Sequence, residues 1–328
     1  MLRHLLAAAI AFGAAGSAAS QERFLHFGTK AAAMGGAFTA VANDTTAFYW
    51  NPAGFAFGPV VHAGVQWGES DMNRGDGSTF GDGAAGFSVG LTFMGVAGTF
   101  SKESSSRLED DVLSSRGLET FDLSVSILQS LPIDDLVIAG SVHYLKGESH
   151  ELFESLAALS PGDETPSAVR DRVLETEGEA SSTASVDLGA LYQPRDWLRL
   201  GLMWRGLFEP GFRLPSGEEI VLPRHGRAGV AFFLPQATTV SFDCDLSSQG
   251  GEDDRFRELS LGVEKRFFDD ALSLRAGLRA EAGSEAGARP AFSAGAGVRI
   301  RFLVLEGAYQ SSSEGRDEAL WFGVTVSP

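Results

Sequence analysis

The 328-residue chain has little of several features that commonly reveal function. Its single cysteine, Cys244, excludes an internal disulfide. Beyond the first twenty residues, no run of 18 or more apolar residues occurs, which excludes a transmembrane helix there. The formal net charge of -17 argues against nucleic acid as a partner, because phosphate binding needs a basic surface.

Catalytic and metal-binding motifs are also missing. The six histidines have no paired spacing suited to zinc, and neither a nucleophile elbow nor a phosphate-binding glycine loop occurs. The acidic stretch at 71–83 could hold calcium but lacks the EF-hand spacing. A lumenal hydrolase built from His143 and a serine is the alternative. We therefore predict no enzyme activity, no metal and no cofactor.

What the chain has in abundance is alternation of apolar and polar side chains. At 87–93 every odd position is apolar, while the even positions are serine, glycine and threonine, and similar patterns recur at 121–127, 184–192 and 272–278. Because an extended strand points successive side chains to opposite faces, each stretch predicts a strand with one apolar face. Alternation alone does not decide between water and lipid outside the sheet.

Fourteen strands can be placed in this way. Their predicted ranges are 59–67, 84–93, 94–103, 117–130, 134–147, 182–193, 197–208, 225–234, 236–246, 257–267, 271–281, 290–300, 302–311 and 319–327. Tight links alternate with long ones, which lie at 68–83, 103–116, 147–181, 209–225, 246–255, 282–288 and 311–318. Outer-membrane barrels likewise have short turns at one rim and longer loops at the other. The sequence therefore predicts an all-β fold, a transmembrane antiparallel β-barrel of about 14 strands within residues 58–328.

Residues 1–20 predict a signal peptide. Arg3 and His4 precede an apolar, alanine-rich stretch that ends in small residues before Gln21. A short membrane anchor is the alternative, but the stretch is too short to span a bilayer comfortably. After cleavage, we expect the protein in the outer membrane of a Gram-negative-type bacterium, in contact with its lipid.

A segment rich in small residues, 21–57, precedes the first predicted strand. Its paired glycines allow a bend, and an asparagine-proline pair marks a turn. The residues that give it this character are Gly35, Gly36, Asn51, Pro52, Ala53 and Gly54. From the residues alone, an ordinary entry loop is the simplest interpretation.

At these residues the chain resembles the FadL-type superfamily of outer-membrane transporters, which includes PorV-like and PorQ-like barrel proteins. The resemblance implies that 21–57 is a hatch inside a fourteen-stranded barrel that transports long-chain fatty acids or other small hydrophobic molecules. PorV-like and PorQ-like relatives imply an alternative, a non-transporting subunit that binds a secretion-machinery protein or a surface-assembly system. The resemblance further implies a kink in the third strand, where Gly95, Ala97 and Gly98 lie.

The strand register places charges of both signs inside the predicted barrel. They are Asp122, His143, Asp187, Arg199, Arg205, Arg227, Asp243, Asp245, Glu258, Glu264, Arg275, Arg279, Arg299 and Glu306. Buried charges need partners, so one interpretation is a network of salt bridges that holds the hatch. The other interpretation is a solute path whose polarity these residues set.

Two predicted outer loops carry unusual apolar residues. Apolar side chains at 152–159 have helical spacing, and a second helix is possible at 168–174. In FadL-type transporters, loops at these positions form a docking groove for hydrophobic ligands. The resemblance therefore implies a ligand-binding groove here, with packing of the loops on themselves as the alternative. Its predicted residues are Phe153, Leu156, Phe208, Phe212 and Leu214.

Overall fold

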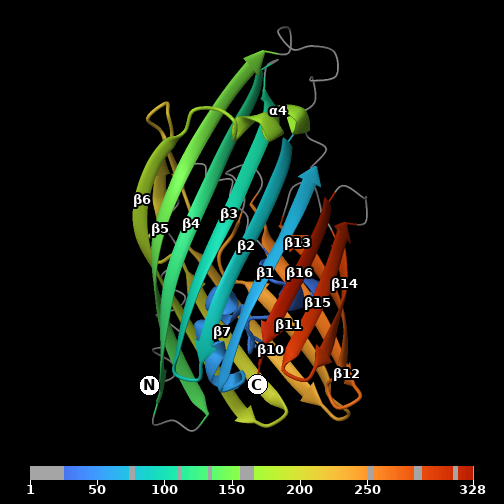
Figure 1. Ribbon diagram of the computed structural model, residues 1–328. Helices are drawn as coiled ribbons and strands as arrows, with labels where there is room; N and C mark the ends of the chain where they lie inside the picture. Colours follow the sequence, from blue (N-terminus) through green and yellow to red (C-terminus); the bar gives the residue numbers. More distant parts are fainter. Residues whose placement is uncertain are drawn as a thin grey trace.

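The computed structural model describes residues 26–73, 78–109, 112–131, 135–155, 166–249, 255–283, 290–312 and 317–327. Within these ranges, fourteen strands form one closed antiparallel barrel (Figure 1). They are β1 (Val61–Asn73), β2 (Ser78–Leu91), β3 (Met94–Glu109), β4 (Val112–Ser130), β5 (Leu136–Ser155), β6 (Glu179–Arg195), β7 (Leu198–Arg205), β10 (His225–Leu234), β11 (Thr238–Asp245), β12 (Arg257–Phe267), β13 (Leu272–Ala282), β14 (Pro290–Ile300), β15 (Leu303–Ser312) and β16 (Asp317–Val326). The predicted fold is confirmed. The described helices are all too short or too polar to cross a membrane.

Alternation sets the two faces of the barrel wall. In β2, Phe87 and Val89 are exposed on the outside, whereas Ser88 between them is buried on the inside. In β4, Leu123 and Val125 are likewise exposed around the buried Ser124. An apolar outer face with a polar lumen is the arrangement of a barrel whose surroundings are lipid.

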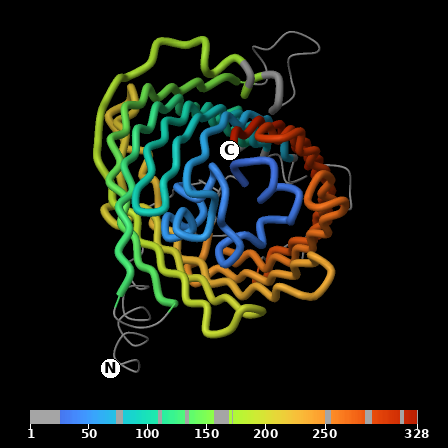
Figure 2. Tube along the Cα trace, turned by 60° about the horizontal axis from the view of Figure 1, so that its bottom comes forward, coloured from blue at the N-terminus to red at the C-terminus, as the bar shows by residue number. Residues whose placement is uncertain are grey.

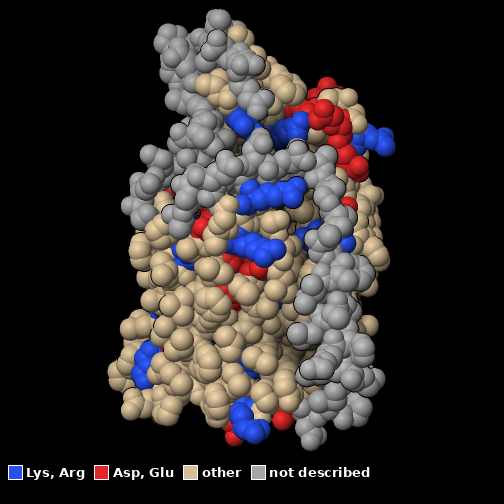
Figure 3. Space-filling model, turned by 180° about the vertical axis from the view of Figure 1, so that it is seen from behind, with Lys and Arg blue, Asp and Glu red and all other residues tan. Residues whose placement is uncertain are grey.

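A row of aromatic side chains marks the upper edge of this apolar surface. Trp67 stacks on Phe322 of the neighbouring strand, and the Phe100 and Phe121 rings lie 4.7 Å apart at the same level of the register. One step higher, Lys102 and Glu119 form an exposed ion pair. On the face shown in Figure 3, charged side chains gather in the upper part and at the lower rim, with a mostly uncharged band between them. Outer-membrane barrels have such a band, bordered by aromatic residues.

The wall is much taller on one side than on the other (Figure 1). Strand β5 has 20 residues and β11 has 8, so at about 3.3 Å per residue they reach roughly 66 Å and 26 Å. The predicted loops at 68–83 and 103–116 are therefore wrong for most of their length. Strands β1 and β2 pair as far as Asn73 and Thr79, and β3 and β4 pair as far as Glu109 and Val112. Most side chains on both faces of these extensions are polar, so apolar alternation does not reveal them.

The connection between β5 and β6 contains one helix, α4 (Pro166–Val173). It packs on the outward face of β2 to β4, where Gly81 faces Arg170 and Gly117 faces Val173 (Figure 1). The helix predicted at 168–174 is thus present. The helix predicted at 152–159 is wrong at 152–155, because these residues pair as the end of β5 with β4. Residues 156–159 lie outside the described ranges.

The N-terminal segment lies inside the barrel ring (Figure 2). It contains α2 (Thr29–Ala33), α3 (Ala47–Trp50) and the 3-10 helix η1 (Pro52–Phe57). We call its described part, residues 26–57, the hatch. Phe38, Trp50 and Phe55 of the hatch are completely buried. The lumen is therefore filled at this level by the chain's own N-terminal segment.

Candidate functional site

The hatch rests against glycines of the barrel wall. These wall glycines are Gly95, Gly189, Gly201, Gly262, Gly277 and Gly295. A Cβ atom added at any of them would lie 2.7 Å or less from an atom of the hatch. At Gly277 the nearest atom would be the backbone nitrogen of Gly35, at 2.2 Å. Glycine in a strand permits such close approach, so the wall glycines define the seat of the hatch.

Three glycines shape the hatch itself. Gly35 and Gly36 have φ values of 64° and 82°, in the left-handed region that favours glycine. Gly54 lies so close to Ala42 that an added Cβ would be 2.3 Å from the Ala42 carbonyl oxygen. The structure thus places the predicted glycines at a bend and at a close contact within the hatch.

Asn51 ties the second half of the hatch to the wall. Its Nδ2 donates to the carbonyl oxygens of Thr39 (3.0 Å) and Ala190 (3.1 Å). Its Oδ1 accepts from the backbone nitrogen of Ala53 at 3.2 Å, which caps the 3-10 helix beginning at Pro52. An asparagine before proline therefore both ends one turn and bonds a wall strand.

Wall side chains satisfy backbone groups of the hatch that have no strand partner. Hydrogen bonds to hatch carbonyls come from Gln310 to Ala32 (2.7 Å), Ser293 to Ala33 (3.0 Å) and Ser241 to Ala37 (2.6 Å). Asp243 Oδ2 accepts from the backbone nitrogens of Phe38 (3.0 Å) and Thr39 (2.7 Å). Buried backbone groups must be paired, so these bonds fix the hatch where it lies.

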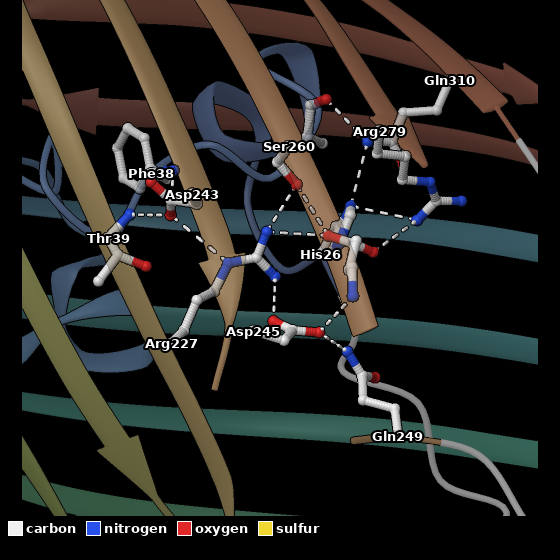
Figure 4. Close-up of polar contacts among 12 residues, drawn as sticks. His26, Phe38, Thr39, Arg227, Asp243, Asp245, Gln249, Ser260, Arg279 and Gln310 are labelled. Atoms are coloured by element: carbon white, nitrogen blue, oxygen red, sulfur yellow. Dashed lines mark hydrogen bonds and ion pairs between the residues drawn. The ribbon is translucent and has the colours of Figure 1, made fainter. Parts of the chain in front are cut away.

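A buried arginine organises one side of the lumen (Figure 4). Arg227 has no exposed surface, and its nitrogens lie 2.9 Å from Glu258, 3.2 Å from Asp245 and 3.5 Å from Asp243. Its guanidinium also lies 5.7 Å from the ring centre of Trp50 in the hatch. We call these four charged residues the Arg227 cluster. Because Asp243 also holds the hatch, the cluster couples the wall charges to the position of the hatch.

His26 joins the Arg227 cluster from the hatch. Its Nε2 lies 2.9 Å from Glu258, and its Nδ1 faces Arg279 at 3.3 Å. The pKa of His26 is lowered from its ordinary value, because burial disfavours the charged ring. The neighbouring Glu258 carboxylate opposes this effect but does not outweigh it. A neutral ring can donate from Nε2 to the carboxylate and present Nδ1 as an acceptor to Arg279.

A second charged group lies beside the hatch under the tall wall. His143 stands between two carboxylates, with Nδ1 2.9 Å from Asp122 and Nε2 3.1 Å from Asp187. Arg205 lies 3.6 Å from Asp187 and 3.7 Å from the ring centre of Tyr49 in the hatch. A third group lies below the hatch, where Arg275 bridges Glu264 (2.8 Å) and Glu306 (2.7 Å).

Arg199 differs from the other predicted lumen charges. It is 6% exposed, and in the part of the chain that the structure describes no ion pair with a carboxylate is found for it. Its guanidinium lies 4.0 Å from the ring centre of Phe57 in the hatch and 4.7 Å from that of Phe233. Gln193 accepts two of its hydrogen bonds. Its stacking on aromatic rings therefore holds the end of the hatch.

Cavities lie on both sides of the hatch. The outer vestibule, on the tall-wall side, has a volume of about 130 Å³ and is lined by Phe27 and Tyr49 of the hatch, among others. The inner vestibule, at the short-turn end, has about 270 Å³ and is lined by Lys30 and Asp44 of the hatch. The described lining residues of the two cavities do not overlap. The hatch is thus the partition between them.

The residues of the predicted docking groove lie in different surroundings. Phe153 and Phe208 are 58% and 70% exposed, whereas Phe212 and Leu214 are buried. Phe212 belongs to a small hairpin, β8 (Gly211–Arg213) and β9 (Glu219–Val221), and packs against Leu118 and Leu145 of the tall wall together with Ile220 and Leu222 of its own loop. Leu156 lies outside the described residues. Phe212 therefore packs against the wall as well as against its own loop, and the docking groove stays a prediction.

The hairpin gives a first mutational prediction. Replacing Phe212 with serine should cost about 3 kcal/mol locally, because it empties a packed apolar site. Leu222 and Pro223 of the same loop line the outer vestibule, so we expect faster release of a hydrophobic probe and earlier protease cleavage within 206–224. The matched control is Phe208→Ser at an exposed position. Equal protease resistance of wild type and Phe212→Ser would contradict the role of Phe212 in holding the hairpin against the wall.

The third strand of the barrel has no kink among its described residues. β3 pairs without interruption with β2 from Arg107 to Met94 and with β4 from Glu109 to Met94. The expected bend near Gly95 is therefore wrong. Gly95 instead leaves room for the Phe55 ring of the hatch, which an added Cβ would approach to 2.3 Å.

Sequence reasoning missed several residues that line the outer vestibule. Phe27 and Tyr49 come from the hatch, Ser185 from β6 and Arg224 from the loop after β9. Alternation along β6 places Ser185 inside the barrel, but it gives no reason to prefer this serine over other lumenal serines. Only the fold brings it to a cavity.

Comparison with known proteins finds similarity of fold. No family model and no curated protein matches the sequence. The toluene transporter TbuX of Ralstonia pickettii is similar with a TM-score of 0.62, at 14% identity over 92% of this chain and 98% of that one. The chain has the FadL-type fold.

Two further solved structures show the same FadL-type fold. The CymD monoaromatic hydrocarbon channel has a TM-score of 0.60 at 13% identity, over 93% of this chain and 98% of its own. The toluene transporter TodX of Pseudomonas putida has a TM-score of 0.58 at 14% identity, over 94% and 98%. The expected resemblance is therefore confirmed at the level of architecture.

Proposed function

We propose that this protein is an outer-membrane transporter that admits small hydrophobic molecules through a barrel closed by a movable hatch. The observation that carries the proposal is the partition itself: a segment of the chain separates two cavities within a barrel whose outer face is apolar. Proteins of the same fold are named as toluene and monoaromatic hydrocarbon transporters or channels, which supports it.

The proposal includes location and chain organisation. Residues 1–20 act as a signal peptide, 21–57 as the hatch and 58–328 as the barrel in the outer membrane of a Gram-negative-type bacterium. Residues 1–25 lie outside the described ranges. The small outer vestibule supports compact molecules as substrates more than long-chain fatty acids. The absence of catalysis and of cofactors, and the alternative of a PorV-like or PorQ-like secretion subunit, stay predictions.

A reversible lock on the hatch tests the proposal. The Oγ1 atoms of Thr45 in the hatch and Thr325 in β16 lie 3.5 Å apart, so cysteines at both positions are within reach of a disulfide. In a Cys244→Ser background, we expect oxidation of this pair to stop uptake of labelled toluene and reduction to restore it. Uptake is measured in proteoliposomes whose outer leaflet contains lipopolysaccharide, because hydrocarbons cross plain phospholipid bilayers unaided.

The matched control links two wall strands. Ser126 and Ser141 have Oγ atoms 2.7 Å apart on the neighbouring strands β4 and β5, so a cysteine pair there joins wall to wall and should leave uptake unchanged on oxidation. Mass spectrometry confirms each disulfide. Wild-type uptake no faster than in protein-free liposomes would contradict the proposal, and unchanged uptake through the oxidised Thr45–Thr325 variant would contradict movement of the hatch. Co-purification of a large partner would favour the secretion subunit.

A further inference from the structure

The size of the outer vestibule limits what it can hold. Its volume is about 130 Å³, and a protein cavity of about 150 Å³ holds one benzene molecule. One ring with a small substituent therefore matches the space. Two side chains of the hatch, Phe27 and Tyr49, supply aromatic surface for such a ring.

One polar group on the vestibule wall has no partner within the described part of the chain. Ser185 is 4% exposed, and its Oγ makes no hydrogen bond there. The side chain lines the cavity from β6, directly across the strand pair from His143. A buried hydroxyl without a partner is unfavourable, so a ligand that bonds to it gains affinity from this position.

The charges around Ser185 are already matched. Asp122 and Asp187 both lie within 3.1 Å of His143 nitrogens, and Asp187 also faces Arg205 at 3.6 Å. At the mouth of the cavity, Arg224 pairs with Glu209 at 2.9 Å. A carboxylate or ammonium ligand would have to break one of these pairs and leave a buried charge alone. A neutral ligand needs no such exchange.

We infer that the outer vestibule selects a neutral single-ring compound carrying a hydroxyl group, a phenol, with Ser185 as its hydrogen-bond partner. The ring lies on the aromatic surface of the hatch, and the hydroxyl reaches β6. This inference rests on the proposed function, since it names the substrate class of the transporter. It separates the protein from a site built for hydrocarbons alone, which offers no partner for a hydroxyl group.

Equilibrium binding of labelled phenol to the purified full chain in detergent tests the inference. Wild type should bind phenol about 2- to 10-fold more tightly than toluene, measured by competition, which is the range of one neutral hydrogen bond. Ser185→Ala should remove this preference by weakening phenol binding while leaving toluene binding unchanged. Ser141→Ala is the matched control, because Ser141 is a buried β5 serine that bonds Ser126 and does not line the cavity.

A cavity-filling variant locates the binding. Thr99 lines the vestibule from β3, so Thr99→Trp should abolish the binding of both compounds. Tighter binding of toluene than of phenol by wild type, or an equal loss of both with Ser185→Ala, overturns the inference, and the wild-type comparison decides even if a variant fails to fold. The assay uses no membrane, so phenol binding without uptake would contradict only the transport proposal. Toluene uptake without a preference for phenol would contradict only the inference.

Discussion

Replacing Arg227 with methionine should lower the free energy of unfolding by about 3–5 kcal/mol, the largest loss expected from a single lumenal change. The reason is that Asp243, Asp245 and Glu258 would remain buried without the cation that faces all three. Loss of one partner from a buried ion pair leaves an uncompensated charge. Urea unfolding in lipid vesicles, followed by tryptophan fluorescence, measures the effect.

Two further variants show whether charge is the cause. Adding Asp245→Asn and Glu258→Gln to Arg227→Met should recover part of the lost stability, because neutral amides replace the stranded carboxylates. Arg257→Met is the matched control: Arg257 is exposed in β12, and we expect a change of less than about 0.5 kcal/mol. A loss below about 1 kcal/mol with Arg227→Met, the value of an exposed pair, would refute the role of the cluster.

Replacing Gly277 with valine should displace the hatch while the barrel still closes. The first added carbon would lie 2.2 Å from the nitrogen of Gly35 and 2.3 Å from the carbonyl carbon of Met34, and these are backbone atoms that no rotamer change can move away. Overpacking forces the backbone to shift. We therefore expect a large rise in ion conductance of single barrels in planar lipid bilayers.

Proteolysis gives an independent measurement of the same displacement. Cleavage within residues 26–57 should become faster in Gly277→Val than in wild type, while the barrel keeps its compact migration in unboiled gels. The control is Gly140→Val in β5, where the nearest atom to an added Cβ is Leu188 Cδ2 at 3.8 Å. Unchanged conductance and unchanged cleavage of a folded Gly277→Val barrel would show that the wall glycines do not seat the hatch.

The strands that cross the apolar band could be predicted closely. The predicted ranges 225–234, 257–267 and 290–300 coincide with β10, β12 and β14. In these segments lipid contacts one face and the polar lumen the other, so every second side chain must be apolar. The extensions of β2 to β5 have no such constraint. Their serine-rich stretches, such as 104–106 in β3, do not alternate and resemble loops in the sequence.

The resemblance to the FadL-type superfamily predicts the hatch inside the barrel, but the small residues of this segment do not predict its contacts. Ala-rich and Gly-Gly sequences allow close packing without saying against what. Asp243 accepts hydrogen bonds from the backbone amides of Phe38 and Thr39, which lie more than 200 residues earlier in the chain. Similarly, the sequence places Ser185 and His143 on inward faces, but the cavity beside them depends on the hatch and on the loop after β9.

The sequence by itself therefore determined the class of fold, the count of strands and, within the apolar band, the face on which each side chain lies. These follow from a local period of two residues that lipid imposes on one face. Only the tertiary structure decided which charges pair, where the hatch rests and how large the vestibules are. Those properties depend on distances between residues far apart in the chain, which barrel closure fixes and local patterns do not encode.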